Sequence, residues 1–134
     1  MKDIVKEAEA IILSLEKNRR NEFALRTNQL RKFLSAVNTV SNKVNVYQAQ
    51  ILSANPSRMS KDLVLSEQLA AEIKYLKVKI AYQAGRERAV RDFVQKAELT
   101  KKIDEIGTDL SKYKEFAKYI EALVAYHKFY GGKD

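Results

Sequence analysis

DLSKYKEFAKYIEALVAYHKFYGG, residues 109–132, predicts one long helix with a defined start and end. Asp109 suits the N-cap position, because its carboxylate accepts from first-turn amides that lack helical partners. Gly131 and Gly132 favour a stop, since glycine adopts left-handed backbone at little cost. At about 100° per residue, one broad side is apolar, formed by Leu110, Tyr113, Phe116, Ala117, Ile120, Leu123, Val124 and His127 and widened by Tyr119, Tyr126 and Phe129. We therefore expect several other helices to cover this one and the chain to fold around it.

Helical spacing of apolar residues recurs through the rest of the chain and predicts an all-α protein. Besides the helix described above, the expected helical segments are a first helix over residues 3–18, a second helix capped by Thr27 or Asn28 and running to Ile51, a segment from Ser60 or Ser66 to Ala84, a short helix after Gly85, and a turn or short helix over residues 100–107. The expected architecture is a compact bundle of about five helices, forming a single helical domain over residues 1–134.

The clearest break between these helices is Asn55-Pro56-Ser57. Proline disfavours helical backbone at the residue before it, so residues 53–62 are expected to form a loop. Gly85 indicates a second end or a kink, because glycine destabilises a helix interior by about 1 kcal/mol relative to alanine.

The composition excludes several classes of protein. The chain has 134 residues, 46% of them hydrophobic, which is enough for one domain with its own core. It contains no Cys, so no disulfide framework or thiolate site can form, and this fits a cytoplasmic protein. No apolar run reaches the roughly 18 residues that a membrane span needs. Residues 1–20 also lack the pattern of a signal peptide, since Asp3, Glu7 and Glu9 stand where basic residues are expected.

The formal net charge of +8 is unevenly distributed. Residues 19–32 carry five Lys and Arg against one Glu, and residues 58–91 carry eight against four, so each segment contributes +4. Basic charge concentrated on two segments favours a polyanionic partner such as nucleic acid. A solvated basic surface without such a partner explains the net charge equally well.

Two lines of polar side chains follow these basic segments. On the second helix, Arg31, Ser35, Asn38 and Asn42 share one line that lacks acids, and such side chains bond phosphate and ribose. The alternative is an ordinary solvated helix face.

On the third helix, Tyr75, Lys79, Tyr82 and Arg86 line up at spacings of four, three and four residues. Gly85 would let a phosphate chain approach closely, and Arg86 offers a planar fork that matches phosphate. Taken alone, this motif favours the alternative of a helix C-cap followed by a surface arginine. With no Trp and few aromatics expected at the surface, the chain is a poor candidate for a base-stacking platform.

The sequence offers no catalytic or metal-binding framework. Its single histidine, His127, lies on the apolar side of the last helix, where a histidine is usually structural. Phosphate-binding glycine loops and the HExxH and DxDxDG patterns are absent. Asp104 with Glu105, or Glu98, would form an acid pair without a positioned base or nucleophile. We therefore expect no enzyme activity, no catalytic residue, no metal and no cofactor.

Three blocks of the sequence resemble the small subunit of type III-A CRISPR effector (Csm) complexes. They are TNQLRKFL at residues 27–34 with Asn38 one turn on, EIKYLKVKIAYQAGR at residues 72–86 continued by Val90 and Phe93, and EALVAYHKFYGG at residues 121–132. The blocks occur in order and span nearly the whole chain from Thr27 onward, and the third is the most specific. Residues 3–18 lie outside the matched pattern.

The resemblance implies a compact five-helix subunit without catalytic activity, repeated along a filament in a ribonucleoprotein for antiviral defence. Its implied partners are the guide RNA, the target RNA, the backbone and large subunits, and further copies of itself, with no membrane. Carried over onto the first two blocks, the resemblance implies that RNA is contacted by Arg31, Asn38, Lys79 and Arg86, with Lys74, Lys77 and Arg88 as further candidates.

Two other functions fit the residues. One is a purely structural helical adaptor whose basic surface meets an acidic protein. The other is a helix-turn-helix regulator, but the third helix is too evenly amphipathic for a recognition helix and no tight turn precedes it.

Overall fold

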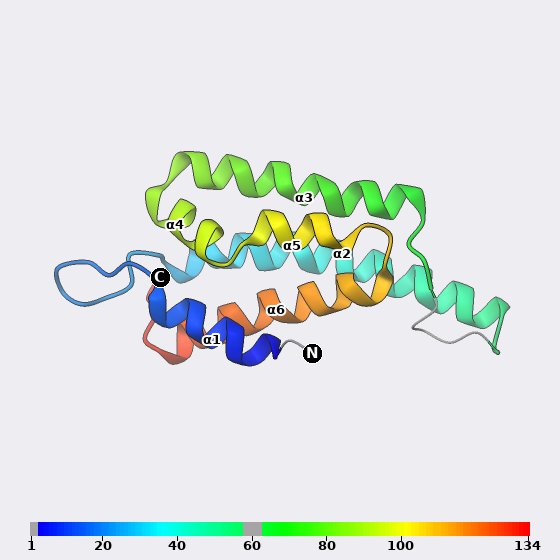
Figure 1. Cartoon of the computed structure of the whole chain (residues 1–134), viewed down its shortest axis with the longest axis horizontal. Coiled ribbons are helices and arrows are strands. Elements are labelled where there is room, and N and C mark those ends of the chain that lie inside the picture. The colour runs from blue at the N-terminus through cyan, green and yellow to red at the C-terminus, as the bar shows by residue number, and fades with distance from the viewer. Residues whose placement is uncertain (1–2, 58–62) are drawn as a thin grey trace.

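The computed structural model describes residues 3–57 and 63–134. In these ranges the chain forms the helices α1 (Ile4–Ser14), α2 (Thr27–Ala54), α3 (Glu67–Arg86), α4 (Arg88–Lys96), α5 (Leu99–Ile106) and α6 (Leu110–Phe129) (Figure 1). The same ranges contain no β-strand, only the isolated bridges Lys17–Phe23 and Val64–Asp109. The predicted all-α class is confirmed, with six helices in place of about five. None of the described helices is both long and apolar enough to cross a membrane.

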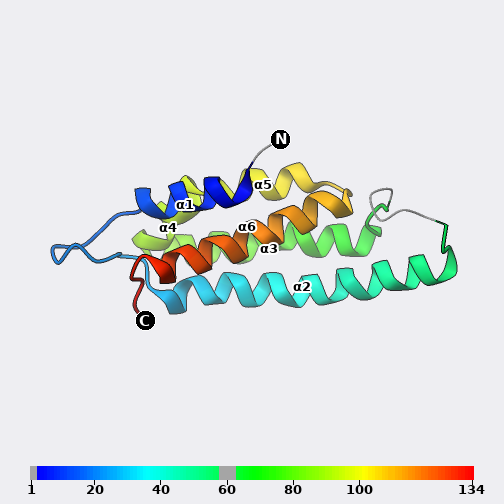
Figure 2. The ribbon, with the colours of Figure 1, turned by 90° about the horizontal axis from the view of Figure 1, so that it is seen from below.

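The three long helices α2, α3 and α6 run side by side, and the short helices α1, α4 and α5 lie together on one side of them (Figures 1 and 2). Helix α2 forms the opposite side and extends beyond the others at its C-terminal end (Figures 1 and 2). Helix α6 packs against α1, α2 and α5, so three elements cover it. This confirms the central place that its broad apolar side predicts.

The side chains that α6 buries include two tyrosines whose hydroxyls are paired inside the core. Tyr113 donates to the carbonyl of Val37 at 3.0 Å, and its oxygen lies 2.8 Å from the Ser41 hydroxyl. Tyr119 donates to the carbonyl of Ala97 at 3.1 Å. Because each hydroxyl bonds to another helix or its end, these tyrosines fix the position of α6 relative to α2 and α4.

Phe129 does not belong to the buried side of α6, contrary to the prediction. Its side chain is 76% exposed, whereas His127, two residues earlier, is fully buried. Two residues correspond to about 200° around a helix, so the two side chains point in nearly opposite directions.

Several helix ends follow the predicted signals. The Asp109 carboxylate accepts from the backbone N–H of Lys112 at 3.2 Å, and the Ser66 hydroxyl accepts from that of Leu69 at 3.2 Å. Helix α2 ends at Ala54, directly before Asn55-Pro56, and α3 ends one residue after Gly85. Of the predicted loop 53–62, residues 58–62 with Arg58 and Lys61 lie outside the described part of the chain.

Helix α1 is shorter than predicted, ending at Ser14 rather than at residue 18. The chain then reverses through Asn21, which has a φ of 61°. The Asn18 side chain accepts from the backbone N–H groups of Arg20 and Glu22 at 2.9 and 3.1 Å. These bonds replace the ones a continuing helix would make. At the end of α1, Lys96 donates to the Ser14 carbonyl at 2.7 Å.

Candidate nucleic-acid interface

A groove of about 850 Å³ runs between α2 and α3. Its floor is made of core side chains from three helices, namely Phe33, Val37, Leu76, Ile80, Phe116 and Ile120. On the α2 side, the surface residues that line the groove after Arg31 and Lys32 are small: Ser35, Ala36 and Thr39. Because small side chains do not fill the space between the two helices, the apolar floor is reached from the surface.

The polar rim of the groove is basic. Arg31 and Lys32 line it from α2 and Lys79 lines it from α3, and none of the lining residues is acidic. Within the described part of the chain these three side chains form no ion pair, while six other basic side chains do. Positive charge is therefore left without a counter-charge beside an open groove, which favours an anionic ligand.

Two tyrosines of α3 also line the groove and are largely exposed. Tyr75 is 58% exposed and Tyr82 is 62% exposed. The Arg86 guanidinium lies over the Tyr82 ring, 5.5 Å from its centroid, which places this cation next to the groove wall. The expectation of few exposed aromatics is wrong, because tyrosines at helical spacing can mark either a buried face or its exposed border.

The remaining predicted site residues lie elsewhere. Asn38 and Lys74 are exposed but do not line the groove. Lys77 points to α5 and bonds the Asp104 carboxylate at 2.6 Å. Arg88 is 3.6 Å from the Glu16 carboxylate, with 87% of its side chain exposed. The fold thus brings Arg31 and Lys79 together and leaves Arg86 beside them, while the other four predicted residues stand apart.

Some groove residues were not singled out by the sequence. Asn28 and Lys32 line it from α2 and Gln83 from α3. Residues 28, 32, 35 and 39 follow at spacings of four, three and four, the same rhythm as Tyr75, Lys79, Tyr82 and Arg86. This line of residues on α2 lies next to the apolar stripe of that helix. Its match to the line on α3 was the signal in the sequence from which the groove residues of α2 could have been predicted.

His127 is buried in the core and does not line the basic groove. Its Nε2 is 2.8 Å from the Leu25 carbonyl, and its ring packs against Phe23 with centroids 5.0 Å apart. Burial lowers the pKa of this imidazole, and the nearby Lys128 charge lowers it further, against the raising effect of the Leu25 bond. Among residues 3–57 and 63–134, no group of three or more His, Cys, Asp or Glu side chains is placed to hold a metal ion.

Comparison with known proteins shows the family of this chain. The model of the Csm2 Type III-A family matches residues 1–133. The chain belongs to this family. The match includes α1, which lies outside the three blocks that carry the resemblance in the sequence.

Relatives of known name support the assignment. The chain is 38% identical to the "CRISPR system Cms protein Csm2" of Streptococcus thermophilus over 130 residues, covering 97% of this chain and 93% of that protein. It is also 38% identical to the protein of the same name from Mycobacterium tuberculosis over 132 residues, covering 98% and 94%. With the Enterococcus italicus protein of that name it shares 42% identity over 108 residues, covering 79% and 68%.

Proposed function

We propose that this chain is the non-catalytic small subunit of a type III-A CRISPR effector complex, working in the cytoplasm in antiviral defence. In this role it contacts guide and target RNA through the groove between α2 and α3. Family membership supports the complex, since its relatives carry CRISPR system names. The observation that carries the RNA-facing role is the set of cations around one acid-free groove: Arg31, Lys32 and Lys79 on its rim, with Arg86 beside it.

The proposed contacts are independent of RNA sequence. Lysine and arginine reach phosphate oxygens, which are the same at every nucleotide, so they position a strand without reading it. An RNA-guided complex accepts many guides, because base pairing between guide and target supplies the specificity. A subunit that binds only the sugar-phosphate backbone of the RNA is compatible with any guide sequence.

Assembly is the second part of the proposal. One groove with a few cations gives little affinity for a single strand at physiological salt. Copies arranged along the same strand, next to the backbone and large subunits, would raise the effective concentration of each later contact. The single domain over residues 1–134 would then act as a repeated unit.

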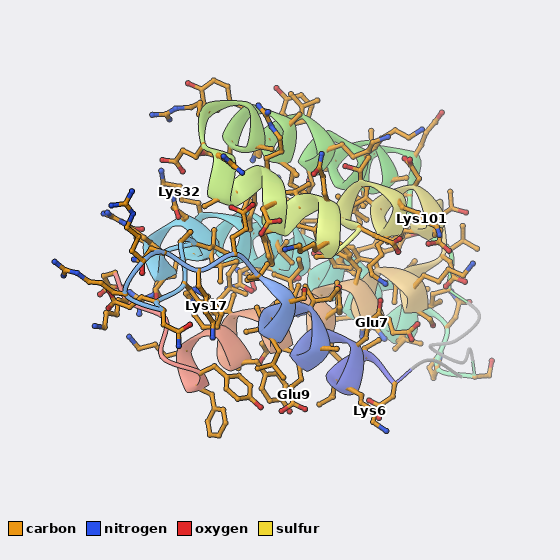
Figure 3. All side chains as sticks on the ribbon, turned by 60° about the vertical axis from the view of Figure 1, so that its left-hand side comes forward. Lys6, Glu7, Glu9, Lys17, Lys32 and Lys101 are labelled. Carbon is orange, nitrogen blue, oxygen red and sulfur yellow. The ribbon has the colours of Figure 1, made fainter. Side chains whose placement is uncertain are left out.

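The test is the double substitution Arg31→Ala with Arg86→Ala, made in the isolated chain and in the reconstituted complex. We expect target-RNA binding to weaken while assembly stays intact. The matched control is Lys6→Ala with Lys101→Ala, which removes two charges from exposed positions on α1 and α5, well away from Lys32 (Figure 3). This control should bind RNA as the unmodified protein does.

The competing function is a protein adaptor whose groove receives an acidic partner chain. It predicts the reverse result for the same variants: unchanged RNA binding with failed assembly. Unchanged RNA binding and unchanged assembly would overturn both functions for this groove.

A further inference from the structure

We infer that the groove between α2 and α3 stacks bases of single-stranded RNA on Tyr75 and Tyr82, in addition to holding the backbone. The inference rests on the proposed RNA-facing function and names what the groove does with the nucleotide. Single-stranded nucleic acid is held where a basic groove tracks the phosphates and aromatic rings receive the bases. Helix α3 provides both features on its side of the groove, with Lys79 as the cation and Tyr75 and Tyr82 as the aromatic rings.

The two rings are not needed to hold the fold together. Tyr47, Tyr113, Tyr119 and Tyr130 each place their hydroxyl 2.6 to 3.1 Å from a bonding partner elsewhere in the chain. Within the described residues the hydroxyls of Tyr75 and Tyr82 make no hydrogen bond, and their side chains are 58% and 62% exposed. Exposed rings whose hydroxyls make no hydrogen bond, next to cations that form no ion pair, are features of a binding surface.

The spacing of the rings fits a strand that lies along α3. Seven residues separate Tyr75 from Tyr82, which corresponds to about 10.5 Å along a helix. That distance is about three times 3.4 Å, the axial spacing of phosphates along one strand of duplex DNA. Two nearby bases of one strand can therefore reach the two rings, with the backbone between them near Lys79.

The charges around the rings suit the same ligand. Lys79 lies between the tyrosines on α3, and Arg31 and Lys32 face them from α2. The Arg86 guanidinium is already held over the Tyr82 ring at 5.5 Å, so a phosphate next to a stacked base would meet a positioned fork. An acidic peptide would use the cations but would leave two aromatic faces without a partner, which is why the strand is favoured.

The experiment compares Tyr75→Ala/Tyr82→Ala with Tyr75→Phe/Tyr82→Phe in the full chain at low salt. The probes are fluorescently labelled oligoadenosine and an abasic ribose-phosphate strand of the same length. The alanine pair should bind oligoadenosine at least about thirtyfold more weakly and the phenylalanine pair should bind it normally, since stacking needs the ring and not the hydroxyl. The phenylalanine pair should leave binding of the abasic strand unchanged, and the alanine pair should weaken it far less than binding of oligoadenosine, because only the position of Arg86 is affected. Circular dichroism should show both variants folded.

Four outcomes overturn the stacking inference. If the unmodified chain binds abasic strand as tightly as oligoadenosine, or if the alanine pair binds oligoadenosine normally, the rings do not receive bases, and the backbone-binding function still stands. If the alanine pair weakens both probes equally, the tyrosines act only by placing Arg86. If the unmodified chain binds neither probe at low salt and the complex needs Arg31 only for assembly, the proposed function fails as well.

Discussion

Only one of the two ring nitrogens of the buried His127 imidazole has a hydrogen-bond partner among the described residues. The Leu25 carbonyl can only accept, so Nε2 carries the proton and Nδ1 is a bare acceptor. Nδ1 is fully enclosed and has no hydrogen-bond partner among the described residues. Burial is the main cause that lowers the pKa from its usual 6.5, because protonation would place a charge in this enclosed site.

This gives a pH dependence of stability with a definite sign. The unfolded chain binds the proton near pH 6.5 and the folded chain only at lower pH, so the free energy of unfolding falls as the pH drops below about 6.5. We expect the urea midpoint of the unmodified protein to fall between about pH 7.5 and 5.5. His127→Gln can still donate to Leu25 and should lose this slope, although it is less stable throughout. Equal slopes in the two proteins would contradict the assignment.

Gly132 adds a second point at the residue scale. Two glycines at the end of α6 predict a helix stop, and Gly131, with a φ of 99°, has the backbone that glycine favours. Gly132 is needed for another reason: a β-carbon there would overlap the His127 ring. The sequence cannot reveal this contact, because it depends on how the tail folds back over the imidazole.

At the scale of elements, the burial of α6 predicts a large cost for truncating its centre. Leu123 is fully buried, so Leu123→Ala should lower the free energy of unfolding by about 2–5 kcal/mol, through lost burial and the cavity left behind. Glu121→Ala, an exposed position on the same helix, is the control and should change stability by less than about 0.5 kcal/mol. Chemical denaturation measures both. Similar losses in the two variants would mean that α6 is not the centre of the core.

The sequence predicts the helices and those of their ends that local signals set, but it does not predict contacts between residues distant in sequence. Caps such as Asp109 and Ser66, and the break at Asn55-Pro56, are local signals, so the ends they set follow from a few neighbouring residues. The early end of α1 involves the local turn bonds of Asn18 and also a bond to the Ser14 carbonyl from Lys96, which is distant in sequence. Distance in sequence is the reason the local pattern misses it.

The candidate site was partly predictable for the same reason. The sequence predicts Arg31 and Lys79 on separate helices, and only packing of α2 beside α3 puts them on one groove. Lys77, two residues from Lys79, faces another helix and pairs with Asp104, because two residues turn a helix by about 200°. Composition indicated the sign of the charge, while the fold decided which cations remain without a counter-charge.

At the scale of the whole molecule, cations of the two basic segments meet across one groove and are not spread evenly. Arg31 and Lys32 come from the segment 19–32 and Lys79 from the segment 58–91, so the two +4 segments contribute to one surface. Such a surface attracts a polyanion from a distance and holds it weakly, because few phosphates are in reach at once. The affinity of the isolated chain should therefore be low, with only a modest dependence on salt.

The salt dependence can be put in numbers. If Arg31, Lys79 and Arg86 each neutralise one phosphate, the plot of log affinity against log salt for single-stranded RNA should have a slope of about −2, using about −0.7 for each contact. Arg31→Ala should reduce the slope by about 0.7, and Lys101→Ala on α5 should leave it unchanged. Fluorescence titrations of the isolated chain with labelled single-stranded RNA at several salt concentrations measure this directly. A slope near zero, or one that Arg31→Ala leaves unchanged, would mean that binding does not depend on these cations. In a filament, each added copy contributes its own contacts to the same strand, so the slope of the assembled complex should be steeper than that of one chain.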